Sequence, residues 1–265
     1  MRFINDSLKF SSMLLMSVFI SMVLFVLISI LGSVTPETLK MAIFSSEVQF
    51  AIQFSLMTAT IATTLGLIIG VPAAYALARY DFRGKNLIDA MVEVPVVIPP
   101  LISGFALLVF FGNTIFGQAI SEQLKGILFT PKGVIVAQFF VATPFIVRTS
   151  KSVFEKIDSK YEYIAQSLGA GKIESFFKIS LPMAKNGILA GMFLAWARSI
   201  GEFGATMMVA GATKMKTETL PVAVFLNISL GNIDMALTIA FVFLMVALII
   251  LMTIRTIANY GSKYT

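Results

Sequence analysis

Long stretches without a charged residue dominate this chain. A helix needs roughly 20 mostly apolar residues to cross the hydrocarbon core of a membrane. Four uncharged stretches reach that length, at residues 10–36, 48–78, 94–121 and 235–254. Two further segments are apolar, residues 133–147 without any charge and residues 186–213 with only Arg198 and Glu202. The pattern therefore predicts six membrane-spanning helices.

The distribution of basic residues predicts how these helices are oriented. The predicted spans lie at about residues 10–34, 48–78, 90–112, 133–151, 185–212 and 233–255, and a polar loop, 152–184, joins the fourth to the fifth. Of the 20 Lys and Arg, fourteen fall in loops on one side of the membrane and five on the other. Cytoplasmic loops are enriched in Lys and Arg, so both termini and loop 152–184 are expected in the cytoplasm.

The composition agrees with an all-α integral membrane protein of one domain, residues 1–265. It is 57% hydrophobic and 13% charged, with a mean hydropathy of +0.90, outside the range of soluble domains. There is no Cys and no His, which excludes disulfides, thiol nucleophiles and imidazole metal sites. The net charge is +6, but the basic residues lie in short loops between apolar stretches, where they set the orientation of the chain in the membrane. No nucleic-acid partner is therefore expected. The first apolar stretch is expected to be a retained span, not a signal peptide.

Small residues recur in the second and fifth predicted spans. Gly66 and Gly70 stand at i and i+4, and so do Gly187 and Gly191. Such spacing lets helix backbones approach closely in a membrane. Two interpretations stand, packing within one bundle or a seam between two copies of the chain.

Prolines interrupt the start of the third predicted span. Pro95, Pro99 and Pro100 each lack the backbone N–H that a helix needs. The span is therefore expected to be kinked or broken there, which is tolerable where neighbouring helices satisfy the freed carbonyls.

Loop 152–184 carries the signals of two short helices. Ser159 followed by Glu162 matches a capping box, in which each side chain caps the backbone of the other. One apolar face then follows at positions i, i+3, i+4 and i+7, at Tyr161, Ile164, Ala165 and Leu168. Gly169 can end this first helix in a left-handed turn.

A second short helix is expected after the glycines. Ile173, Phe176 and Phe177 share one face, and Leu181-Pro182 is expected to close it. From periodicity alone, the hairpin either lies on lipid as an amphipathic element or docks onto another protein.

The same loop resembles the cytoplasmic loop with which permease subunits of ABC importers dock onto their ATP-hydrolysing partners. The matches are Ala165, Gly169, Ile179, Leu181 and Pro182. The Glu-Ala-Ala opening of that motif is here Tyr163-Ile164-Ala165, with Glu162 one position early. The resemblance implies that the residues coupling the chain to an ATPase are Tyr161, Glu162, Ile164, Ala165, Leu168, Gly169, Ala170, Ile179, Leu181 and Pro182.

Gly169-Ala-Gly-Lys172 also looks like the end of a phosphate-binding loop, but its details do not fit. Gln166 stands where that motif needs its first Gly, Ile173 stands where it needs Ser or Thr, and no strand precedes the run. The chain is therefore not expected to be an enzyme or to bind a cofactor itself. ATP and Mg²⁺ are expected in a separate subunit.

Arg198 and Glu202 are the only charged residues in the apolar segment 186–213. They stand at i and i+4, within reach of each other, and about 18 Å into the membrane from Asn186. Ionisable residues at this depth normally face the bundle interior or water. Either the pair fixes packing, or Arg198 attracts an anion in a translocation pathway that also includes Glu202 and Phe203.

The segment 196–206 resembles the fifth-span signature of permeases for sulfate, molybdate and tungstate. Residues 71–84, 93–100, 219–226 and 231–234 are similar to the same group, most to its molybdate and tungstate branch. The resemblance implies an oxyanion importer of the cytoplasmic (inner) membrane, with a homodimer of this chain, two ATP-binding subunits and an extracytoplasmic oxyanion-binding protein. The rival substrate is sulfate or thiosulfate. An ion-coupled carrier or channel is the alternative of another class, and it leaves loop 159–182 unexplained.

Overall fold

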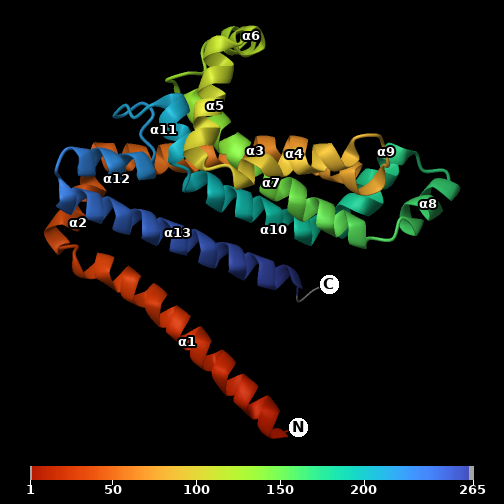
Figure 1. Ribbon diagram of the computed structural model, residues 1–265, viewed down its shortest axis with the longest axis horizontal. Helices are drawn as coiled ribbons and strands as arrows, with labels where there is room; N and C mark the ends of the chain where they lie inside the picture. Colours follow the sequence, from red (N-terminus) through yellow and green to blue (C-terminus); the bar gives the residue numbers. More distant parts are fainter. Residues whose placement is uncertain (1, 263–265) are drawn as a thin grey trace.

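The computed structural model describes residues 2–262, with side chains from residue 8 to residue 250 and at residue 252. Every regular element in these residues is a helix (Figure 1). In chain order they are α1 (Arg2–Gly32), α2 (Pro36–Phe44), α3 (Ser46–Arg79), α4 (Lys85–Val97), α5 (Pro100–Asn113), α6 (Ile115–Gln123), α7 (Pro131–Lys156), α8 (Lys160–Ser167), α9 (Lys172–Ser175), the π-helix η1 (Phe176–Ser180), α10 (Leu181–Ile200), α11 (Gly204–Ala210), α12 (Leu220–Ser229) and α13 (Ile233–Ser262). This confirms the all-helical fold. The chain ends themselves, residue 1 and residues 263–265, lie outside the described part.

Four helices in the described residues are long and apolar enough to cross a membrane. They are Leu8–Gly32 within α1, Ser46–Arg79, Pro131–Lys156 and Ile233–Ile250 within α13. The bent pair α4 and α5 raises the number to five if it is taken as one span. The first, second, fourth and sixth predicted spans each coincide with one of these helices.

Helices α3, α7 and α10 form the centre of the fold, and glycines set how closely they approach. A Cβ on Gly66 would lie 3.0 Å from the Ile146 side chain, and one on Gly191 would lie 3.1 Å from Thr149. Gly70 and Gly187 also meet side chains of α7. All four glycines therefore face α7, and they allow packing within one bundle, the first of the two interpretations given above.

Two predicted spans are broken. The predicted third span, 90–112, corresponds to α4 and α5, whose axes differ by 113°. The break falls before Pro99 and Pro100, which donate no backbone hydrogen bond. The predicted fifth span, 185–212, was expected to be continuous, but α10 ends at Ile200 and α11 begins at Gly204. The structure also contains α2, α6 and α12, three short helices in the connections between spans.

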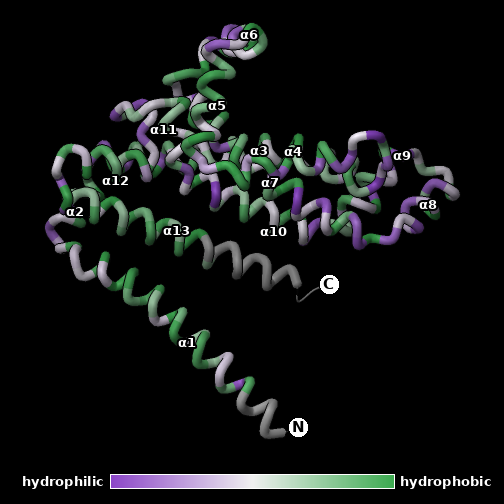
Figure 2. The backbone as a smooth tube through the Cα atoms, in the orientation of Figure 1, coloured by the Kyte–Doolittle hydropathy of each residue, from purple (hydrophilic) through white to green (hydrophobic). Residues whose placement is uncertain are grey.

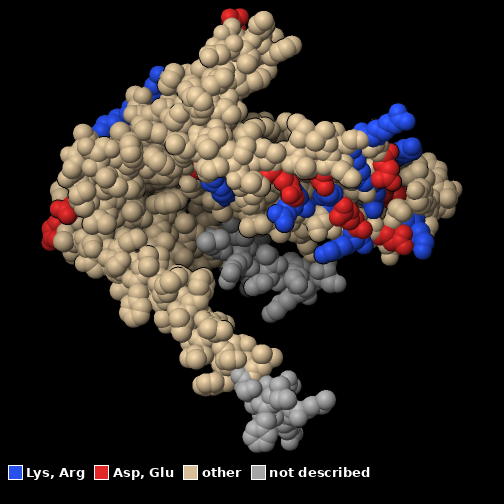
Figure 3. Space-filling view, viewed as in Figure 1, with Lys and Arg blue, Asp and Glu red and all other residues tan. Residues whose placement is uncertain are grey.

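Apolar and charged surfaces separate along the long axis. Figure 2 shows α1 as an apolar helix standing away from the bundle, and its large apolar side chains are exposed from Leu8 to Leu31. On the face seen in Figure 3, most charged side chains gather in the half that carries α8 and α9, while few lie over the other half. A surface with few charges beside a charged end is the arrangement that a lipid bilayer requires.

Candidate functional site

Loop 152–184 folds into a short helix that is not capped as the sequence predicts. Helix α8 begins after Ser159, but the Ser159 side chain makes no capping hydrogen bond. Asp158 Oδ1 instead accepts a hydrogen bond from the Lys160 backbone N–H at 2.9 Å. The predicted capping box is therefore wrong. Glu162, the second residue of that pattern, accepts hydrogen bonds from other helices instead.

Glu162 points into the bundle. It is 6% exposed, and its carboxylate accepts three hydrogen bonds from other elements. Arg79 Nε donates to Oε1 at 2.9 Å, Tyr75 Oη donates to Oε2 at 2.7 Å, and Ser180 Oγ donates to Oε1 at 2.7 Å. We call this set of four side chains the Glu162 anchor. It bonds α8 to the C-terminal end of α3 and to η1, directly before α10.

The environment keeps Glu162 ionised. Burial by itself raises the pKa of its carboxyl group, but the hydrogen bonds from Tyr75, Ser180 and Arg79, together with the guanidinium charge, outweigh burial and hold the pKa below its usual value. The carboxylate thus stays charged at neutral pH. A charged acceptor makes stronger hydrogen bonds than a neutral one.

Aromatic rings surround the anchor. The Tyr75 ring lies 4.7 Å from that of Phe176 and 5.4 Å from that of Phe154, both in edge-on geometry. Phe154 is fully buried at the end of α7. Polar contacts therefore hold α8 against α3 and η1, and aromatic contacts hold η1 against both α3 and α7.

The opposite side of α8 is apolar and exposed. Tyr161, Ile164 and Leu168 are 52%, 59% and 85% exposed. Beyond the turn, Ile173 and Phe177 are 75% and 59% exposed. We call these five side chains the α8 apolar face. The periodicity predicted such a face, and the described residues do not cover it.

The remaining predicted coupling residues shape the turn and the start of α10. Gly169 has φ +95°, the left-handed value expected at the end of the helix, and Ala170 N–H bonds back to Ala165 at 3.0 Å. Ile179 and Leu181 are half-buried, while Pro182 is exposed.

The second short helix does not close at Leu181-Pro182 as expected. Helix α9, η1 and α10 follow one another without a gap. Pro182 is tolerated because it stands in the first turn of α10, where a missing N–H costs little. The coupling loop is consequently continuous with the fifth predicted span.

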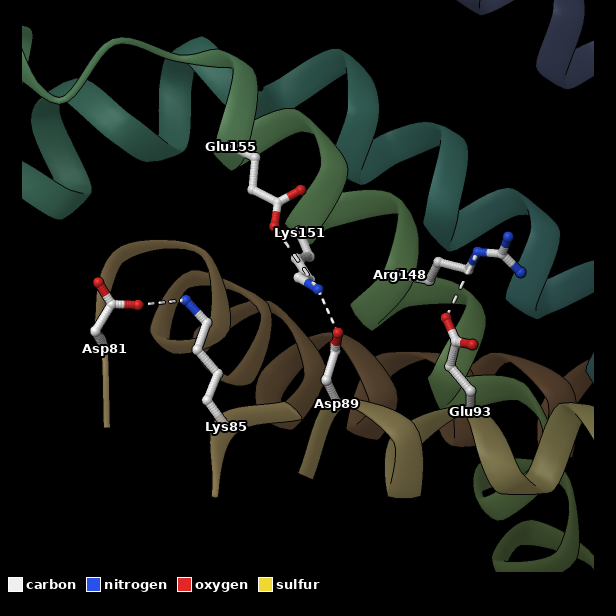
Figure 4. A network of polar contacts seen from close by, with 7 residues as sticks. All are labelled: Asp81, Lys85, Asp89, Glu93, Arg148, Lys151 and Glu155. Carbon is white, nitrogen blue, oxygen red and sulfur yellow. Dashed lines mark hydrogen bonds and ion pairs between the residues drawn. The ribbon is translucent and has the colours of Figure 1, made fainter. Parts of the chain in front are cut away.

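Ion pairs connect α4 to the C-terminal half of α7 (Figure 4). Lys151 Nζ lies 2.6 Å from Asp89 and 3.7 Å from Glu155, and Arg148 lies 3.9 Å from Glu93. Helix α4 has no buried residue. Polar contacts therefore contribute much of its attachment to the bundle.

Arg198 and Glu202 form an ion pair at the break between α10 and α11. Arg198 Nη1 lies 2.6 Å from Glu202 Oε2, with side chains 29% and 0% exposed. Glu202 Oε1 also accepts a hydrogen bond from the Ala205 backbone N–H at 2.8 Å, in the first turn of α11. The predicted proximity is confirmed. Phe203, the third predicted pathway residue, packs against Phe225 of α12 with the two rings tilted by 46° and their centroids 5.3 Å apart.

The two broken helices touch. A Cβ on Gly104 of α5 would lie 2.6 Å from Ala205 Cα, and one on Gly204 would lie 2.9 Å from the Leu101 backbone nitrogen. Only glycine allows this approach. Ser103, Ser199 and Thr206 near the breaks are almost fully buried, and their hydroxyls find no partner in the described residues. Irregular backbone at membrane depth is found where it is buried in protein or lines a cavity.

Sequence reasoning found the α8 apolar face and the charged pair but missed Tyr75, Arg79 and Ser180. Tyr75 and Arg79 stand at i and i+4, so they share one face of α3. That spacing was the available signal. Nothing in it pointed to Glu162, 83 residues beyond Arg79.

Comparison with known proteins gives related permeases. A probable molybdenum ABC transporter permease protein of Haloferax volcanii is 40% identical over 213 residues, 80% of this chain and 77% of that protein. The molybdate/tungstate transport system permease protein WtpB of Pyrococcus abyssi is 43% identical over 160 residues, 60% of each chain. The sulfate transport system permease protein CysT of Salmonella typhimurium is 33% identical over 219 residues, 82% of this chain and 79% of that protein.

The fold is also that of a solved transporter. A bacterial alginate ABC transporter, crystallised in complex with an alginate pentasaccharide-bound periplasmic protein, superposes with a TM-score of 0.76 at 15% identity over 98% of this chain and 95% of that one. Residues 62–256 match the family described as binding-protein-dependent transport system inner membrane component. These residues include α8, the Glu162 anchor and both helix breaks, and the chain belongs to this family of membrane permeases.

Proposed function

We propose that this chain is the transmembrane subunit of an ABC importer that moves molybdate or tungstate into the cytoplasm. It has six spans, with α10 and α11 forming the fifth and both termini in the cytoplasm. Two copies of the chain form the passage. Two ATP-binding subunits drive it from the cytoplasm, and an extracytoplasmic binding protein delivers the oxyanion.

The observation that carries this proposal is the α8 apolar face on its charged anchor. Helix α8, which carries this face, lies at the end of the bundle, beyond the tips of α3, α7 and α10 (Figure 1). Exposed apolar side chains in such a place are typical of a protein contact. The Glu162 anchor fixes α8 to α3 and α10, so a push on α8 from a closing ATPase moves two spans together.

The chemistry of an oxyanion explains why the passage needs ATP. Moving one charge against the membrane potential costs about 2.3 kcal/mol per 100 mV, so a dianion entering a negative interior meets about twice that cost. Arg198 lies at a helix break, partly exposed, and supplies positive charge at membrane depth. The two broken helices in contact give the pathway a place where small backbone shifts open or close it.

The substrate assignment rests on the molybdenum and tungsten permeases among the relatives, whose identity exceeds that of the sulfate permease. Uptake by the purified complex, reconstituted in vesicles with its binding protein, tests it. We expect tungstate accumulation that needs ATP on the α8 side and survives collapse of the membrane potential and ion gradients by ionophores. Accumulation that needs no ATP and stops with the ionophores would show that the chain is an ion-coupled carrier instead. Uptake of sulfate alone would show that the substrate is sulfate.

A further inference from the structure

A cavity of about 300 Å³ with one polar and one apolar wall opens at the end of the molecule opposite α8. It lies between the start of α3, the connection from α11 to α12, and the facing ends of α12 and α13 (Figure 1). Its polar wall consists of Ser45, Glu47, Lys214, Glu218, Asn227 and Asn232. A volume of this size takes about ten water molecules, or a long side chain.

One of the three charged groups in this wall lacks a partner of opposite charge. Lys214 Nζ lies 3.0 Å from both carboxylate oxygens of Glu47, so these two neutralise each other. Glu218 is 0% exposed, and Oε2 accepts one hydrogen bond from the Met215 backbone N–H at 2.9 Å. Its Oε1 has no hydrogen-bond partner among the described residues.

Local structure holds Glu218 in place. Its neighbours Thr217 and Thr219 are also fully buried, and Thr217 Oγ1 accepts a hydrogen bond from the Thr213 backbone N–H at 3.0 Å. The next residue, Leu220, donates its N–H to the buried Ser55 hydroxyl at 2.8 Å. The carboxylate is therefore a fixed part of the cavity wall and not a side chain free to turn to solvent.

The charge of Glu218 is not needed for its structural contact. A glutamine oxygen would accept the Met215 N–H equally well and would avoid the cost of burying a charge. Burial raises the pKa of this carboxyl group; the Met215 N–H lowers it, Glu47 adds to the rise, and the charge of Lys214, which is paired with Glu47, offsets only part of it. A cation bound in the cavity would remove that penalty, because it would supply the missing partner of Oε1.

We propose that this cavity receives one basic side chain, Lys or Arg, of the extracytoplasmic binding protein. The ammonium or guanidinium group donates to Glu218 Oε1 in a charge-assisted hydrogen bond. Asn227 supplies a second acceptor, because its Nδ2 already donates to the Ala223 carbonyl at 2.9 Å and its Oδ1 is left for the ligand. This inference rests on the proposed function, which places this end of the molecule outside the cytoplasm.

The test uses the complete transporter complex in lipid nanodiscs and its own loaded binding protein. In Glu218→Gln the Kd for the binding protein should rise about tenfold or more, since the variant keeps the Met215 contact but loses the charge. Glu37→Gln is the matched control, because Glu37 is an exposed acidic residue of α2 outside the cavity wall, and its Kd should stay unchanged. An unchanged Kd in Glu218→Gln, or an equal rise in both variants, overturns the proposal.

A second measurement does not depend on how Glu218 variants fold. The chain has no cysteine, so Leu230→Cys places a single thiol in the cavity wall, at a residue that is 67% exposed. Saturating binding protein should slow maleimide labelling of this thiol several-fold, and an unchanged rate contradicts the proposal. If the affinity for the binding protein depends on added Na⁺ or Ca²⁺, the cavity binds an inorganic cation, and this result also overturns the proposal. If the unaltered complex hydrolyses ATP faster with the binding protein while both tests fail, only the cavity proposal is lost; without any such stimulation, the importer function fails first.

Discussion

The Glu162 carboxylate of α8 lies 2.9 Å from the Arg79 guanidinium at the end of α3, and both side chains are about nine-tenths buried. A residue in loop 152–184 is thus bonded to the C-terminal end of a helix that is long and apolar enough to cross a membrane. Two more hydrogen bonds, from Tyr75 and Ser180, complete the anchor. The loop is therefore part of the rigid body that includes α3 and the start of α10.

Replacing Glu162 by Gln should loosen this body. The variant removes the charge opposite Arg79, whose Nη2 is already buried without a hydrogen-bond partner in the described residues. We expect a loss of about 1–3 kcal/mol in stability and a marked fall in substrate transported per ATP hydrolysed. Thermal unfolding and a paired uptake and hydrolysis assay measure both. Glu174→Gln in the same loop is the control, because its ion pair with Lys178 is solvent-exposed and should contribute little. Equal behaviour of the two variants would contradict the anchor.

A charge on the α8 apolar face should break docking without harming the permease itself. Leu168 is 85% exposed, so Leu168→Asp should leave insertion and thermal stability unchanged while the ATP-binding subunit no longer co-purifies. Ser167→Asp adds the same charge one residue away, off this face, and should retain the subunit. Retention in Leu168→Asp would remove the docking role and favour the hairpin on lipid.

The Arg198 and Glu202 pair can be assigned by comparing single and double variants. Arg198→Met alone leaves a buried carboxylate without its cation, which costs about 3–5 kcal/mol and should abolish uptake for either role of the pair. In Arg198→Met with Glu202→Gln, stability should largely return because no unpaired charge remains. We expect uptake to stay low, since the anion has lost its attraction. Restored uptake in this double variant would show that the pair acts in packing only.

The contact between the broken helices makes a steric prediction. In Gly104→Ala the new Cβ would meet Ala205 backbone at 2.6 Å, so α5 and α11 must separate. A loss of about 1–3 kcal/mol and slower uptake should follow. Gly112→Ala, in the same helix, meets only the Leu128 side chain at 3.6 Å and should be tolerated. Normal melting and uptake in Gly104→Ala would refute the close contact.

The pH dependence of the anchor follows from its lowered pKa. An acid whose pKa is lower in the folded state contributes stability above its unfolded pKa, and that stability is lost as pH falls through the folded value. The unfolded value for Glu is about 4.3. The melting temperature of the unaltered protein should therefore exceed that of Glu162→Gln by a constant amount from pH 8 to about pH 5, and the difference should shrink below about pH 4. A difference that shrinks near neutral pH would contradict the lowered pKa.

The sequence pattern predicted those features that depend only on residues close together in the chain. Uncharged runs located the spans, and the spacing of Tyr161, Ile164 and Leu168 located an exposed face, because helical periodicity is a property of neighbouring residues. The partner of Glu162 could not be predicted in this way. Its capping role had good local support, and the competing partners Tyr75 and Arg79 come from a helix more than 80 residues earlier.

The helix break at residues 201–203 illustrates the same limit. The apolar pattern of residues 185–212 predicts one span without a break. The break becomes visible only when Glu202 is seen to bond the first turn of α11 and Gly204 to meet Leu101. Contacts with α5 thus decide where the helix ends, and no local pattern in the segment contains them.

ATP hydrolysis by the complex, purified from its native membrane and reconstituted in liposomes, tests whether this permease works with an ATPase and a loaded binding protein. We expect hydrolysis to rise with binding protein loaded with molybdate or tungstate and not with binding protein loaded with sulfate. Absence of both a co-purifying ATPase and hydrolysis would contradict the importer function itself.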